Sequence, residues 1–153
     1  MKEEERINIS TKKYVRQLYT VNSNLKEVYN ECQYYMSHTE LKEFYEKSFF
    51  SKNNFSNNLY SYLKVRNKGV LFLTDLKTSY FISCLTFQLI FQKDKIKFLF
   101  KKALKLEERN FELLKKLLKT SALPESLVPI LKNHHDSQAT RIAAIKKVLK
   151  DQQ

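Results

Sequence analysis

Apolar residues recur along most of the chain at alternating steps of four and three, the spacing that places them on one face of an α-helix. The first stripe of this kind predicts a helix over residues 11–36, roughly seven turns long. A β-strand would instead need apolar residues at alternate positions, and this segment does not provide them. The stripe comprises Tyr14, Leu18, Val21, Leu25, Val28, Cys32 and Tyr35.

A second and a third helix are predicted to follow. The second begins at a capping-box pattern formed by Ser37 and Glu40, and Gly69 would end it in the left-handed C-terminal position. The third is a shorter helix over 75–92, capped by Thr74. The second stripe comprises Leu41, Phe44, Ser48, Phe55, Leu59 and Tyr62, and the third presents Tyr80, Cys84, Phe87 and Phe91 on one side.

Two further stripes predict a fourth and a fifth helix. Asp94 is the expected N-cap of the fourth, which ends near Lys119. Pro124 suits the opening turn of the fifth, which runs toward Leu149, and Pro129 should kink this helix or delay its start. The fourth stripe comprises Ile96, Leu99, Ala103, Leu106, Asn110, Leu113 and Leu117, and the fifth Leu127, Leu131, His134, Gln138, Ile142 and Ile145.

Short connections between these helices make sequence neighbours antiparallel, and the stripes must face one another to be buried. The single glycine among 153 residues argues against a sheet protein, because each hairpin usually needs its own turn glycine. We therefore expect an all-α protein, an antiparallel four-helix bundle with one additional short helix. It would form one domain over 11–153, preceded by a frayed segment over 1–10.

The chain is strongly basic, with a net charge of +12 and a pI near 9.6. Such an excess attracts anions, and Lys97, Lys101 and Lys105 on the fourth helix are the candidate anion-binding residues. Most of the cations are lysines, however, whereas arginine is the residue suited to bidentate contacts with phosphates and guanine edges. A solvated basic face, produced by composition alone, is the reading we expect over nucleic-acid binding.

Several functional classes lack their signatures in this sequence. With one glycine the chain contains no phosphate-binding loop, and no serine or cysteine nucleophile lies at a recognisable spacing, so neither catalytic residues nor a cofactor are expected. Cys32 and Cys84 follow no metal or redox spacing and are expected to be reduced. The charged start is no signal peptide, and the apolar stretch over 80–91 is too short to span a bilayer. These features indicate a cytoplasmic protein without a membrane partner.

A metal site inside the bundle is the main chemical alternative. A carboxylate-bridged di-iron site needs two Glu-x-x-His pairs, and the sequence contains none. A partial site could form from Glu107, Glu108 and His134. The competing interpretation, which we favour, is a hydrogen-bonded core polar cluster of Asn110, His134 and Gln138 that fixes the register of the helices.

Three segments carry a resemblance to a bacterial ferritin-like family of unknown function. They are the run from Leu25 to Asn30 (LKEVYN), the run from Leu41 to Tyr45 (LKEFY) followed by Phe55 and Leu59, and the run LPESL over 123–127. The resemblance covers about 14–149 and implies a ferritin-type bundle with no assigned activity.

Carboxylates are missing at two positions where the relatives carry them. Asn30 and Asn58 stand where this family usually has glutamate, and only Glu107 or Glu108 matches an acidic position of its fourth helix. The resemblance therefore implies the shape of the family without a complete metal site. A non-catalytic structural or interaction module is the expected function, with an unidentified protein or a second copy of the chain as its partner.

Overall fold

The computed structural model describes residues 9–36, 39–66, 68–120 and 123–151, with side chains described throughout these ranges except at 9–10, 39–40 and 61–74. Within these ranges the chain forms five α-helices and no β-strand, which confirms the prediction of an all-α protein for the part described. The helices are α1 (Ile9–Tyr35), α2 (Thr39–Arg66), α3 (Lys68–Ile90), α4 (Lys95–Leu118) and α5 (Val128–Asp151).

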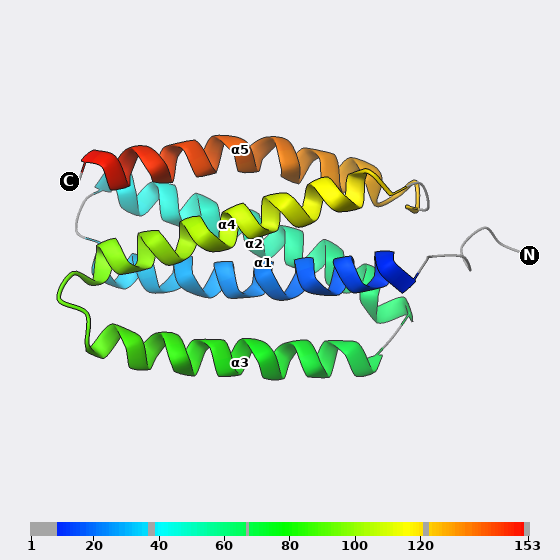
Figure 1. Ribbon diagram of the computed structural model, residues 1–153, viewed down its shortest axis with the longest axis horizontal. Helices are drawn as coiled ribbons and strands as arrows, with labels where there is room; N and C mark the ends of the chain where they lie inside the picture. The colour runs from blue at the N-terminus through cyan, green and yellow to red at the C-terminus, as the bar shows by residue number, and fades with distance from the viewer. Residues whose placement is uncertain (1–8, 37–38, 67, 121–122, 152–153) are drawn as a thin grey trace, which may run out of the picture.

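Successive helices run antiparallel, so that the chain passes back and forth along one long axis (Figure 1). Helix α1 is central and packs against α2, α3 and α4, while α5 packs mainly against α4 and also contacts α2. Helices α1, α2, α4 and α5 thus form a four-helix arrangement. Helix α3 packs against α1 and α2 on the outside of this group.

The interior between the four helices is filled chiefly by leucine, supplemented by aromatic side chains. Branched and aromatic side chains of this size each contribute about 1.5–3 kcal/mol when removed from water, so they provide most of the driving force for packing. Many of these interior positions are occupied by residues of the predicted apolar stripes. The fully buried ones include Leu18, Leu25, Leu59, Leu99, Leu117, Leu131 and Ile145.

The additional helix is not short, and this prediction was wrong. Helix α3 has 23 residues, nearly as many as the 24 of α4 and of α5. It begins at Lys68, so Gly69 and Thr74 lie inside it and cap neither α2 nor α3. The apolar residues at 70–73, read from the sequence as a link, instead continue the helix toward its N-terminus.

The ends of α4 and α5 follow the sequence signals more closely. Asp94 is extended (φ −109°, ψ 91°) and its carboxylate accepts a hydrogen bond from the Lys97 amide at 2.9 Å, which confirms the predicted N-cap. Pro124 was predicted in the opening turn of the fifth helix, and this was wrong: it lies in the turn before α5, where its carbonyl accepts from the amide of Leu127 at 2.9 Å. Helix α5 begins at Val128, so Pro129 falls in its first turn, where no amide donor is required. The predicted delay of this helix is confirmed.

Some sequence predictions concern residues outside the description. Ser37 of the expected capping box and residues 1–8 of the expected frayed segment lie there, whereas Ile9 and Ser10 belong to the first turn of α1.

Cys32 and Cys84 are free thiols, and only Cys32 is buried. None of the described helices combines the length and the apolar character needed to cross a bilayer.

Candidate functional site

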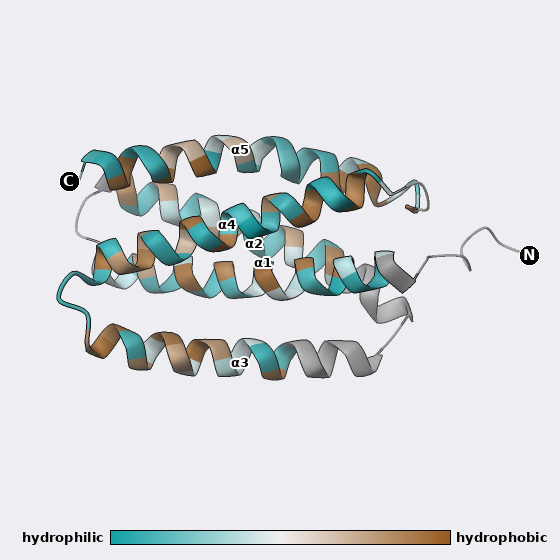
Figure 2. Cartoon of the chain, viewed as in Figure 1, coloured by the Kyte–Doolittle hydropathy of each residue, from teal (hydrophilic) through white to brown (hydrophobic). Residues whose placement is uncertain are grey.

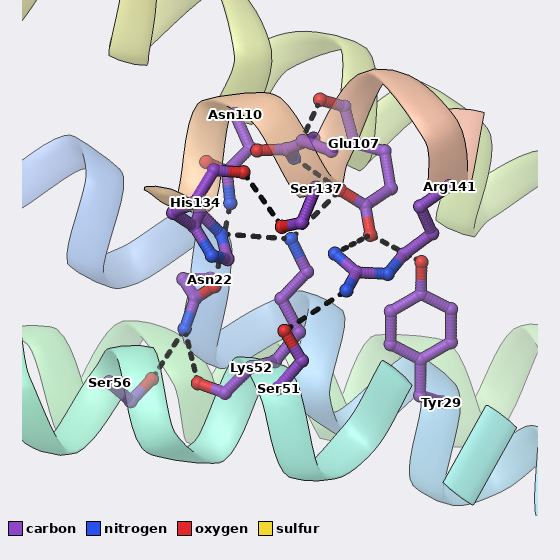
Figure 3. A network of polar contacts seen from close by, with 11 residues as sticks. Asn22, Tyr29, Ser51, Lys52, Ser56, Glu107, Asn110, His134, Ser137 and Arg141 are labelled. Carbon is purple, nitrogen blue, oxygen red and sulfur yellow. Dashed lines mark hydrogen bonds and ion pairs between the residues drawn. The ribbon is translucent and has the colours of Figure 1, made fainter. Parts of the chain in front are cut away.

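Polar side chains from four helices meet inside the bundle, where hydrogen bonds and ion pairs connect them (Figure 3). We call this group the buried network. Helices α1, α2, α4 and α5 all contribute to it, and α3 contributes no member among its described side chains. The members are Asn22 and Tyr29 of α1, Ser51, Lys52 and Ser56 of α2, Glu107 and Asn110 of α4, and His134, Gln138 and Arg141 of α5.

The carboxylate of Glu107 is the centre of the buried network and is fully shielded from solvent. Lys52 Nζ donates to Oε2 at 2.8 Å, and the hydroxyl of Tyr29 donates to Oε1. Gln138 Nε2 donates both to Oε2 and, at 3.1 Å, to the main-chain carbonyl of Glu107. Arg141 Nη1 lies 3.8 Å from Oε1. Donors from three other helices therefore compensate the desolvation of this buried charge.

Lys52 supplies the cation that neutralises Glu107, and its side chain is also 0% exposed. Burial lowers the pKa of Lys52 to about 8, although the adjacent Glu107 carboxylate limits the drop. The Lys52 ammonium therefore remains largely protonated at neutral pH. Arg141, whose Nη2 donates to Ser51 Oγ at 3.0 Å, places a second positive charge beside it. Two cations and one carboxylate share the site.

His134 lies against Lys52 and is held by an aromatic ring. Its imidazole stacks on Phe55, with ring centroids 3.7 Å apart and planes 4° from parallel. His134 Nε2 lies 3.3 Å from Lys52 Nζ, and because an ammonium can only donate, Nε2 must be the unprotonated acceptor. Burial and the positive charges of Lys52 and Arg141 hold the pKa of His134 far below its ordinary 6.5, so the imidazole is neutral.

A second set of contacts joins α1 to α2 and α4 beside this centre. Asn22 Nδ2 donates to the main-chain carbonyl of Lys52 at 2.8 Å and to Ser56 Oγ at 2.6 Å. Asn110 Nδ2 reaches Asn22 Oδ1 at 3.5 Å. These bonds fix the height of α1 relative to its neighbours, since a shift by one helical turn would break all of them.

The structure brings together only two of the three residues proposed as metal ligands. Glu107 and His134 both contact Lys52, whereas Glu108 points outward, is 49% exposed and pairs with Lys146 at 3.0 Å. Among the residues that the structure describes, no group of three or more His, Cys, Asp or Glu side chains could hold a metal ion. The ammonium of Lys52 occupies the position between carboxylate and imidazole that a metal would need.

The three residues of the expected core polar cluster are all buried inside the bundle. Asn110, His134 and Gln138 are 0%, 6% and 0% exposed. They do not bond to one another: Gln138 contacts Glu107, His134 contacts Lys52, and Asn110 contacts Asn22. The residues that connect them were missed at the sequence level, and they are Asn22, Tyr29, Lys52 and Arg141.

No family model matches this chain, and neither a curated protein nor a solved structure matches it significantly. These comparisons neither support nor contradict the resemblance to ferritin-like bundles. Function must be argued from the arrangement of residues.

The lysines proposed as an anion site lie on one side of α4. Lys101 and Lys105 are exposed, Lys97 is half-buried, and their spacing of four residues places them in one row. Neighbouring charges are partly compensated, because Glu112 pairs with Lys115 at 3.0 Å. Lys101 and Lys105 thus belong to the solvent-exposed surface of α4.

Helix α3 exposes an apolar face that the sequence analysis had placed inside the bundle. Among its described side chains Leu85 and Leu89 are buried, so the stripe of Tyr80, Phe87 and Phe91 points away from the core. Figure 2 shows hydrophobic residues gathered along the C-terminal half of this helix. We call the exposed set the α3 face; it comprises Leu76 (52% exposed), Tyr80 (74%), Phe87 (64%), Ile90 (67%) and Phe91 (69%).

Proposed function

We propose that this chain is a ferritin-like helical bundle that acts as a non-catalytic interaction module and binds protein through the α3 face. The observation that carries the proposal is the exposure of five large apolar side chains, four on α3 and Phe91 in the turn that follows it. Isolated apolar residues are common on protein surfaces, but a contiguous patch is typical of interaction sites. Aromatic residues, three of the five here, are also enriched where proteins meet.

The attachment of α3 supports the same function. Leu85 and Leu89 fasten one side of the helix to the core, and Phe81 packs partly against it. The opposite side is thereby held on a fixed support, and little conformational entropy needs to be lost when a partner binds. The buried network serves this support, because its hydrogen bonds set the register of the four helices beneath.

Metal binding at Glu107 and His134 is the alternative that the fold suggests. A divalent ion could take this position only if Lys52 lost its proton and withdrew, since its ammonium lies 2.8 Å from the carboxylate and 3.3 Å from the imidazole. One carboxylate and one imidazole would then remain as ligands, fewer than iron or zinc sites normally use.

Elemental analysis of untagged protein tests this alternative directly. We expect no stoichiometric iron, manganese or zinc, with or without added metal during purification. Bound metal near one equivalent, lost in a Glu107→Gln variant that keeps its helical content, would contradict the proposal and establish a metal site.

The α3 face itself is tested by site-specific photo-crosslinking in cells. A benzophenone amino acid at Phe91 is expected to give discrete adducts. The matched control places it at Lys47, which is equally accessible on α2 with a side chain 77% exposed. We expect no discrete adduct from that position.

A second substitution links any adduct to the apolar face. Phe87→Lys should remove the adducts formed from position 91, while the melting temperature changes by no more than about 2 °C, because exposed substitutions shift stability by only about 0.5 kcal/mol. Equal adduct patterns from positions 91 and 47, or adducts that survive Phe87→Lys, would overturn the α3 face as a binding surface.

A further inference from the structure

The described side chains along one exposed line of α3 are arranged symmetrically about a point between Ser83 and Cys84, in the C-terminal half of the helix. Positions 76, 80, 83, 84, 87 and 91 follow one another at steps of four, three, one, three and four, so the spacing is the same in both directions. Large apolar residues occupy the four outer positions, and Ser83 and Cys84 occupy the centre. At 100° per residue all six lie within about 50° of one line along the helix.

We propose that the α3 face binds a second copy of this chain, with the two α3 helices antiparallel and a two-fold axis passing between Ser83 and Cys84. A two-fold interface requires a surface that is complementary to itself. Here Leu76 would lie opposite Phe91 of the partner subunit, and Tyr80 opposite Phe87 of the partner subunit. The small side chains at the centre let the helices approach closely, while the aromatic pairs fill the space on either side.

Charge favours this location for the contact between copies. The chain carries a net charge of +12, so two copies repel one another over most of their surface. From Thr78 to Gln92, however, the sequence contains no charged residue at all. A two-fold interface brings like groups close together, and like charges there would cost several kcal/mol. The stretch from Thr78 to Gln92 avoids that cost.

The exposed area is sufficient for a dimer of moderate affinity. Each aromatic side chain carries about 200 Å² of surface, so the five residues of the α3 face offer roughly 600 Å² per copy, near the ~800 Å² that each partner contributes to a standard interface. A bilayer is a poorer match, because helices that bind at lipid surfaces carry lysine or arginine beside their apolar face. The described exposed residues of α3 beside the α3 face are Asp75, Lys77, Ser79, Ser83, Thr86 and Gln88, so a single cation lies among them.

This inference rests on the proposed function, and two measurements test it. Sedimentation equilibrium should give twice the chain mass of 18.3 kDa at high protein concentration. Phe87→Lys should raise the dissociation constant at least 30-fold, on the order of the effect of removing a central aromatic from an interface. A short bis-maleimide should join Cys84 to Cys84 of the partner subunit, and Cys84→Ser should abolish this product.

Mixed cysteine variants determine the direction of the two helices. In a Cys84→Ser background, Leu76→Cys and Phe91→Cys should crosslink when the two proteins are mixed, and neither should do so alone. Crosslinking of Leu76→Cys by itself would indicate parallel helices and overturn the arrangement.

A monomer at every concentration would overturn the second copy as partner. If the photo-adduct from position 91 then contains a different protein, the interaction module survives without the dimer. If no adduct forms, both proposals fail.

Discussion

Replacing Lys52 with methionine is expected to lower the free energy of unfolding by about 3–5 kcal/mol, the usual effect of removing one partner from a buried ion pair. The melting temperature should fall by roughly 10 °C for a chain of this size. The reason is that Glu107, itself 0% exposed, would keep its charge without the ammonium 2.8 Å away. Tyr29 and Gln138 would still donate to it without carrying charge, and Arg141, whose Nη1 lies 3.8 Å away, is too far to replace the hydrogen bond of the ammonium. Chemical denaturation followed by circular dichroism measures the effect.

The matched control is Lys47→Met on the same helix. Its side chain is 77% exposed and lies 3.8 Å from Glu43, so this substitution should change stability by less than about 0.5 kcal/mol. The double variant Lys52→Met with Glu107→Gln should recover a large part of the loss, because it removes both charges together. If Lys52→Met were no more harmful than Lys47→Met, the ammonium would have to reach solvent, and the buried ion pair would be wrong.

Acid should destabilise the protein through His134. The imidazole is neutral in the folded state because its pKa lies far below 6.5, whereas in the unfolded chain it takes up a proton near pH 6.5. The unfolded state therefore binds more protons below pH 6.5, and stability falls as the pH falls. The loss attributable to this residue should reach about 2–3 kcal/mol at pH 4.5. The stability itself is unaffected by this residue above pH 6.5 and decreases steadily below that value.

The variant His134→Leu isolates this contribution. At neutral pH it should cost about 1–2 kcal/mol, because Lys52 loses an acceptor 3.3 Å away while keeping Glu107. Between pH 6.5 and 4.5 its stability should fall by about 2–3 kcal/mol less than that of the wild type. His135→Leu, which alters a partly exposed side chain stacked on Phe111, is the control and should keep the wild-type slope. Parallel pH profiles for His134→Leu and the wild type would contradict a buried neutral imidazole.

The sequence predicted the helices well because each stripe reports a local property, the side of a helix that avoids water. It also placed Asn110, His134 and Gln138 on inward stripes, and all three are buried. Lys52 occupies an equivalent position, four residues after Ser48 and three before Phe55, but a lysine is usually solvated and was not counted. Its burial depends on a carboxylate at the same height on another helix, 55 residues away in sequence, and no local pattern contains that information.

The sequence did not predict which side of α3 faces the core, for a related reason. Apolar residues lie on more than one side of this helix, so its sequence does not determine whether Leu85 and Leu89 or Tyr80 and Phe87 turn toward the core. Periodicity fixes a face only when the other faces are polar. In the folded protein α3 packs against α1 and α2 through Leu85 and Leu89, and the side that carries Tyr80 and Phe87 is exposed to solvent.

The buried network also constrains the order in which the protein can assemble. Some of its contacts, such as that of Asn22 with Ser56, lie within a hairpin of successive helices. Others join distant residues, such as Asn22 with Asn110 and Lys52 with His134, and these do not reward the early closure of a hairpin. A nascent chain that has released only α1 to α4 holds Glu107 and Lys52 beside an open, hydrated groove, without Gln138 and Arg141 of α5. The ion pair becomes dry only when α5 docks. The buried network is therefore complete only when α1, α2, α4 and α5 are all in place.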